Sequence, residues 1–133
     1  MIPVIPGIRT SMVALLMLAC LSSCVEEPVY YPVLVTIEPL ESDITMTGAK
    51  LKAEVKDAGN QKITEYGIEI YRNIITNPAG RQTIQGAPSA GIFEVNFTGL
   101  EPGTKYYFRA YALINTAEFY SQNAMHQFTT KTE

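Results

Sequence analysis

From Val33 onward, apolar and polar residues alternate with a period of two, and this alternation limits the possible folds more than any other feature of the sequence. In the clearest run, lysine and glutamate separate the apolar residues Ala49, Leu51, Ala53 and Val55. Successive side chains of a strand point to opposite faces, so such a run predicts a strand with one buried and one solvated face. Helical spacing is nowhere sustained for about three turns. The sequence therefore predicts an all-β domain over residues 33–133.

Similar runs predict strands at residues 33–37, 65–71 and 93–97 and a last strand that ends at 130. Pro39 interrupts the first of these, and we expect residues 44–46 to resume it at a sheet edge, where proline is tolerated. The stretch 73–91 is long for a loop in so small a domain. Its glycines and prolines flank residues 81–85, which we predict to be a short edge strand.

A more specific pattern, Leu-x-Pro-Gly-Thr-x-Tyr, is formed by Leu100, Pro102, Gly103, Thr104 and Tyr106. It resembles the turn that enters strand F of fibronectin type III domains. The resemblance implies an immunoglobulin-like β-sandwich in which Tyr106 forms the tyrosine corner beside Leu100 and Pro102. Independently of the family, Pro-Gly favours a tight turn, and a buried tyrosine can hold a loop through its hydroxyl while its ring packs.

Residues 1–23 have the composition of a secretory signal peptide. Arg9 precedes an apolar run from Met12 to Leu21, which two serines follow. This order matches the charged, apolar and cleavage regions of such a signal. The apolar run is also shorter than the roughly 20 residues that a membrane-spanning helix needs. We expect this segment to be removed and to take no part in the fold.

The segment Leu21-Ser22-Ser23-Cys24 resembles the bacterial lipobox. The resemblance implies that the signal is cut before Cys24, whose thiol carries a diacylglyceryl group that holds the protein in a membrane. The alternative is an ordinary cleaved signal followed by a chance cysteine. The chain has two cysteines, and the other one lies within the signal, so we expect no disulfide in the mature domain.

Residues 24–32 are predicted to be the lipidated cysteine and a short extended tether, because their prolines and acids follow no period. Glu26 and Glu27, so close to the cysteine, resemble the surface-export signal of Bacteroidota-type lipoproteins. That resemblance implies an outer-membrane protein that is exposed at the cell surface. The alternative is that the two acids merely keep the tether solvated.

Composition excludes several classes of function. The net charge is −3, with 13 acidic and 10 basic residues, so the chain has no basic excess that would attract nucleic acid. His126, the one histidine, has no nucleophile and orienting acid near it in the sequence, and we interpret it as structural or surface-exposed. Glu38, Glu41 and Asp43 lack EF-hand spacing, which favours a solvated bend over a calcium site. We expect no catalytic activity, no cofactor and no metal.

The candidate binding residues follow from the alternation. If Tyr106 and every second residue after it point into the core, the residues between them point outward. The outward patch on two neighbouring strands then consists of Glu69, Tyr71, Tyr107, Arg109 and Tyr111. Tyrosine and arginine are enriched at binding hot spots. The alternative is that these aromatic residues pair across strands and only stabilise the sheet.

Together, these features predict a lipid-anchored, single-domain β-sandwich at the bacterial outer membrane. We expect a non-catalytic binding or adhesion module for a protein partner or a glycan. The alternative is a structural spacer or accessory subunit of a surface complex, as in glycan uptake or a pilus-like assembly. The sequence leaves the oligomeric state open.

Overall fold

The computed structural model describes residues 25–72 and 77–133, so the predicted signal peptide and Cys24 lie outside the described residues. Within these residues the strands are β1 (Val33–Ile37), β2 (Ala49–Asp57), β3 (Ile63–Tyr71), β4 (Gly80–Gln85), β5 (Gly91–Phe97), β6 (Lys105–Ile114), β7 (Ala117–Tyr120) and β8 (His126–Thr129). A 3₁₀ helix, η1 (Glu41–Asp43), separates β1 from β2. No helix in this described part is long and apolar enough to cross a membrane.

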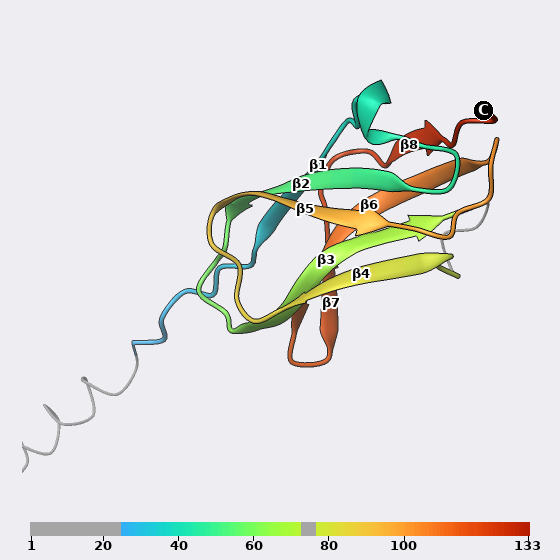
Figure 1. The fold of residues 1–133 in the computed structure, drawn as a ribbon. Coiled ribbons are helices and arrows are strands. Elements are labelled where there is room, and N and C mark those ends of the chain that lie inside the picture. Colours follow the sequence, from blue (N-terminus) through green and yellow to red (C-terminus); the bar gives the residue numbers. More distant parts are fainter. Residues whose placement is uncertain (1–24, 73–76) are drawn as a thin grey trace, which may run out of the picture.

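The strands form two antiparallel sheets that pack face to face (Figure 1). The small sheet has the order β1-β2-β5. The large sheet has the order β4-β3-β6, and both β7 and β8 pair with the remaining edge of β6. The predicted all-β sandwich is confirmed.

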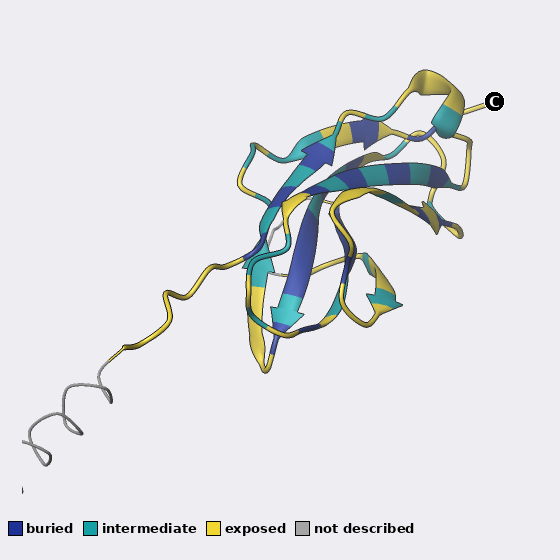
Figure 2. Cartoon of the chain, turned by 90° about the vertical axis from the view of Figure 1, so that its left-hand side faces the viewer, coloured by how far each residue is buried: buried dark blue, intermediate teal, exposed yellow. Residues whose placement is uncertain are grey.

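The alternation in the sequence becomes an alternation in burial, which Figure 2 shows as bands along the strands. The alanines on the inward sides of β2 and β6 are buried, and their small size leaves room for the larger side chains between the sheets. The central part of the core consists of Leu34, Leu51, Ala53, Val55, Ile68, Ile70, Phe108, Ala110 and Ala112. The inward faces of both sheets therefore carry the residues that the period of two assigned to them.

Two of the local predictions have opposite outcomes. The edge strand expected at residues 81–85 is present as β4. The strand expected at residues 44–46 is wrong, because only an isolated bridge joins Ile44 to Ala49. The backbone turns there instead, since the Thr45 N–H donates to the Gly48 carbonyl at 2.9 Å.

Tyr106 lies near the start of β6 and faces the core. Its side chain is 3% exposed, and its hydroxyl accepts a hydrogen bond from the Glu101 N–H at 3.1 Å. The ring stacks on Phe128 of β8, with 5.6 Å between the ring centroids. Leu100 packs against the core beside it, and Pro102 precedes a glycine of positive φ. The hydroxyl therefore fixes the loop that leads into β6.

The segment between β7 and β8 leaves the large sheet and covers the free edge of β1. The side-chain amide of Asn123 makes the two hydrogen bonds that the backbone of a neighbouring strand would make. Its Oδ1 accepts from the Thr36 N–H and its Nδ2 donates to the Thr36 carbonyl, each at 3.0 Å. The Thr36 hydroxyl lies 2.8 Å from Nδ1 of His126. Covering an edge in this way blocks pairing with other chains. His126 is thus part of the contact that joins the two sheets.

The residues just before β1 form neither helix nor strand, and they are fastened to the turn after β2. Asn60 makes three hydrogen bonds to them: Oδ1 accepts from the Tyr30 N–H at 2.8 Å, Nδ2 donates to the Pro28 carbonyl at 2.8 Å, and the Asn60 N–H donates to the Tyr30 carbonyl at 3.0 Å. Gly59 has φ +69°, and a Cβ there would clash with the Tyr30 carbonyl. We call this contact the tether clamp.

Candidate functional site

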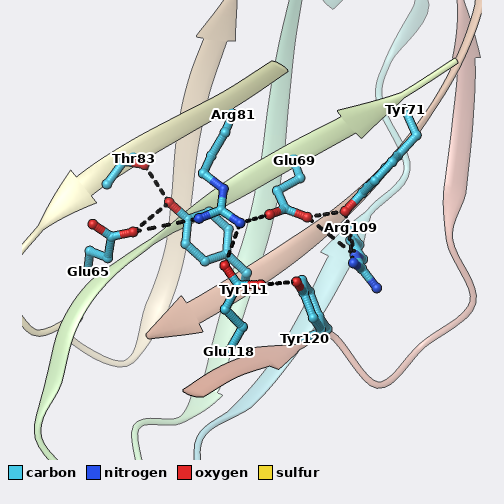
Figure 3. A network of polar contacts seen from close by, with 9 residues as sticks. All are labelled: Glu65, Glu69, Tyr71, Arg81, Thr83, Arg109, Tyr111, Glu118 and Tyr120. Atoms are coloured by element: carbon cyan, nitrogen blue, oxygen red, sulfur yellow. Dashed lines mark hydrogen bonds and ion pairs between the residues drawn. The ribbon is translucent and has the colours of Figure 1, made fainter. Parts of the chain in front are cut away.

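A network of nine polar and aromatic side chains covers the outer face of the large sheet (Figure 3). We call it the tyrosine–arginine face; its members are Glu65, Glu69, Tyr71, Arg81, Thr83, Arg109, Tyr111, Glu118 and Tyr120. The register brings them together, because Glu69 lies directly opposite Arg81 on β4 and Arg109 on β6. Tyr111 likewise lies opposite Tyr120 on β7.

Glu69 is the centre of this face, and it is only 1% exposed. One carboxylate oxygen accepts from Nη2 of Arg81, and the other accepts from the Tyr71 hydroxyl. The second oxygen also lies 3.5 Å from Nε of Arg109. A buried carboxylate needs partners that replace its lost water, and here two guanidinium groups and a hydroxyl do so.

Arg81 of β4 contacts three acidic residues on two other strands, β3 and β7. Beside its contact with Glu69, Nη2 donates to Glu118 at 2.6 Å, and Nη1 lies 3.9 Å from Glu65. The guanidinium carbon sits 4.2 Å from the centroid of the Tyr111 ring. Burial disfavours the charged guanidinium, but its hydrogen bonds to Glu118 and Glu69 outweigh that effect and raise the pKa of Arg81. Arg81 therefore remains charged and holds β4 to β3 and β7.

Arg109 lies between two tyrosine rings. Its guanidinium carbon is 3.3 Å from the centroid of the Tyr120 ring and 5.1 Å from that of Tyr71. Nε and Nη2 both donate to the Tyr71 hydroxyl, at 3.1 and 2.8 Å. Burial, together with the hydrogen bond to Glu69, raises the pKa of Tyr71 to about 12. Burial and a hydrogen bond to Glu118 also raise the pKa of Tyr120.

Tyr111 is fully buried although it lies on the outer face. It is directly opposite Gly67 on β3, and its hydroxyl is hydrogen-bonded to the Thr83 hydroxyl and, at 3.4 Å, to Glu65. A Cβ at Gly67 would clash with the Gln82 carbonyl of β4, so only glycine lets the two strands approach this closely. Burial raises the pKa of Tyr111.

All five residues predicted as a binding patch lie on this outer face. The expected exposure is wrong for Glu69, Tyr71 and Tyr111, which are buried, whereas Tyr107 and Arg109 are partly exposed. Arg81 of β4 lies over the Tyr111 ring, Arg109 of β6 lies over the Tyr71 ring, and both arginines contact Glu69. The patch predicted from the sequence lacks four further members of this face, Arg81, Thr83, Glu118 and Tyr120, although the same alternation continues through β4 and β7.

The carboxylates of Glu38, Glu41 and Asp43, in the segment before β2, do not form a metal-binding cluster. Asp43 faces Lys52 at 3.9 Å. In residues 25–72 and 77–133 no group of three histidine, cysteine, aspartate or glutamate side chains is arranged to hold a metal ion.

The fold and the face together define a small β-sandwich domain with a rigid polar layer on one side. Among the solved structures similar to it are two of the sensor domain of the anti-sigma factor RsgI4 from Pseudobacteroides cellulosolvens. A short form of that domain is 18% identical, with a TM-score of 0.55, over 80% of this chain and 98% of the other. The solution structure is 16% identical, with a TM-score of 0.54, over 75% of each chain. At such identities the similarity shows the fold alone. No protein-family model and no curated protein matches the sequence.

Proposed function

We propose that this protein is an outer-membrane lipoprotein, anchored through Cys24, whose fibronectin type III-like domain is a non-catalytic binding or adhesion module at the cell surface. Its ligand is a protein partner or a glycan, which binds the exposed part of the tyrosine–arginine face. The sensor role named for the RsgI4 domain is in keeping with a sandwich that recognises a ligand rather than transforms it.

One observation carries the binding proposal: Tyr107, Arg109 and Tyr120 are partly exposed on a base that is already rigid. Arg109 is held in place by Tyr71 below it and by the Tyr120 ring beside it. Ordering a long side chain at an interface costs roughly 0.5–1.5 kcal/mol, and here that cost is met in folding. Preorganised tyrosine and arginine side chains are the residue types that dominate binding energy at interfaces.

The double substitution Tyr107→Ala with Tyr120→Ala tests this proposal. We expect it to weaken binding more than tenfold, about 1.4 kcal/mol, while the domain stays folded. The measurement combines a glycan array with recovery of partners from native membranes, for the wild type and the double variant. Lys52→Ala, on the outer face of the small sheet, is the control and retains binding. Equal binding by the wild type and the double variant would show that the ligand does not bind the tyrosine–arginine face.

The anchor has a separate test. Cys24→Ser converts the protein from a membrane-bound to a soluble or unprocessed form, because each buried CH₂ of an acyl chain contributes about 0.8 kcal/mol of membrane affinity. Labelled fatty acid is incorporated by the wild type and not by the variant. A wild type that takes up no label, together with a variant that still partitions with membranes, would overturn the lipoprotein proposal.

A structural spacer or accessory subunit is the second candidate, and the network itself favours it. The polar atoms of Glu69, Arg81 and Tyr111 are already paired with one another or with their neighbours. A face that satisfies its own hydrogen bonds can serve stability alone. If no ligand emerges and the tyrosine variants mainly lower the melting temperature, the accessory role replaces the binding role.

A further inference from the structure

Exposed apolar side chains gather at the end of the sandwich where the segment before β1 enters it, and Figure 2 shows this segment as an exposed strip. Val25, Val29, Tyr30 and Tyr31 of the segment are each more than half exposed. So is Ile92 at the start of β5, which lies beside the last residues of β2 and therefore near the same end. We call these five residues the tether-end patch.

The folded domain fixes the position of this patch. The tether clamp bonds both the N–H and the carbonyl of Tyr30 to Asn60, which follows β2 of the small sheet. The Tyr31 ring stacks on Phe119 of β7 in the large sheet, with 4.9 Å between the ring centroids. The segment is therefore bound to both sheets, and a surface that binds the patch orders little of the protein.

Charged side chains of both signs surround the patch. The exposed ones near the clamp are Lys56 and Lys62, with Glu26, Glu27 and Asp57. A surface that attracts anionic lipid carries a cluster of lysine and arginine without matching acids. The patch has no such excess, so apolar burial rather than charge would drive its contact with a partner.

We propose that the tether-end patch lies in the headgroup layer of the membrane, with Val29 and Tyr30 at the boundary between headgroups and acyl chains. The inference rests on the proposed lipid on Cys24, the residue that precedes Val25. A lipid attached so close makes insertion of the patch an intramolecular step, so a surface of low affinity is sufficient. Tyrosine suits this layer, because its ring is apolar and its hydroxyl bonds to polar headgroup atoms.

The sequence contains no tryptophan, so a substituted tryptophan reports on one position. The test uses the protein isolated from membranes and reconstituted in vesicles of phosphatidylethanolamine and phosphatidylcholine, the second brominated in its acyl chains to quench nearby tryptophan. We expect the emission of Tyr30→Trp to shift to shorter wavelength and to lose most of its intensity. The loss should be the same at low and high salt, because it does not depend on charge.

Leu40→Trp is the matched control. Leu40 is 62% exposed and Tyr30 is 59% exposed, but Leu40 lies beside η1, at the opposite end of the sandwich (Figure 1). Its emission should be unchanged by the brominated lipid. Val29→Trp repeats the measurement next to Tyr30, and circular dichroism melts establish that the three variants fold.

Mass spectrometry of the same samples separates the two proposals. Protein without acyl chains would overturn the proposed anchor and this inference with it. In acylated protein, the inference alone is overturned if neither Tyr30→Trp nor Val29→Trp is quenched, or if Leu40→Trp is quenched as strongly. An emission change that requires added outer-membrane proteins would assign the patch to a protein partner and would also overturn the inference.

Discussion

The outward side chains of the small sheet stand in solvent, whereas those of the large sheet bury one another. On β2, Lys56 pairs with Glu54 at 2.9 Å, and both remain partly exposed. On β3, Glu69 has the same outward orientation, but it is buried under side chains from β4, β6 and β7. Both faces arise from the same alternation, and they differ in how many long side chains converge on one point.

This difference shows that alternation determines the side of a sheet on which a residue lies and not its burial. An exposed ion pair contributes about 0–1 kcal/mol, because water competes for both partners. Removing one partner of a buried ion pair has a much larger effect on stability, because it leaves the other charge buried without a partner. The two faces should therefore respond very differently to equivalent substitutions.

The largest expected effect is that of Glu69→Ala. It leaves Arg81 and Arg109 without their shared carboxylate, and we expect the free energy of unfolding to fall by about 3 kcal/mol. Glu54→Ala on the small sheet should change it by less than about 0.5 kcal/mol. Urea denaturation of both variants measures the contrast. Similar losses for the two variants would mean that the large sheet has no buried polar layer.

Gly67→Ala should follow, with a loss of about 2 kcal/mol, because the added methyl group forces β4 away from β3. Gly80→Ala is the matched control, since a Cβ there would meet only side-chain atoms, at 3.4 Å or more. Thermal melts compare the two. A stable Gly67→Ala protein would show that β4 can shift without disturbing the face.

Tyr106→Phe and Tyr107→Phe compare the inner and outer sides of β6. The first removes the acceptor of the Glu101 N–H and should cost about 1 kcal/mol. The second removes a hydroxyl on the partly exposed side and should be nearly silent. Equal shifts in urea midpoints would contradict the assignment of the two sides.

The smallest expected effect is a loss of stability in alkali. The pKa of Tyr71 is raised to about 12 in the folded protein, whereas a tyrosine in the unfolded chain ionises near pH ~10. The stabilisation from neutral Tyr71 is therefore complete below pH ~10 and is lost as the pH rises toward 12. Melts at pH 9 and pH 11 should show a larger decline for the wild type than for Tyr71→Phe. Parallel declines would exclude Tyr71 as the source.

Much of the fold follows from local pattern, including β1, the edge strand β4 and the inward residues of β2 and β6. The burial of Tyr111 does not, because it depends on Arg81, which lies over the ring from a strand far back in the chain. Strand β7 carried a usable signal: Asn115, at φ 56°, forms with its neighbour a two-residue turn between Ile114 and Ala117. Recognising that hairpin would have added Glu118 and Tyr120 to the candidate site.

The tether clamp has a consequence for how the domain would stand on a membrane. With the proposed lipid on Cys24, only residues 25–27 separate the anchor from backbone that Asn60 holds, and three extended residues reach about 10 Å. Strand β2 then leads away from that end for roughly 30 Å, from Asp57 back to Ala49. The domain would then be held at a short and nearly constant distance from the membrane. Its far end, which carries η1, would point away from the lipid headgroups and toward the surroundings of the cell.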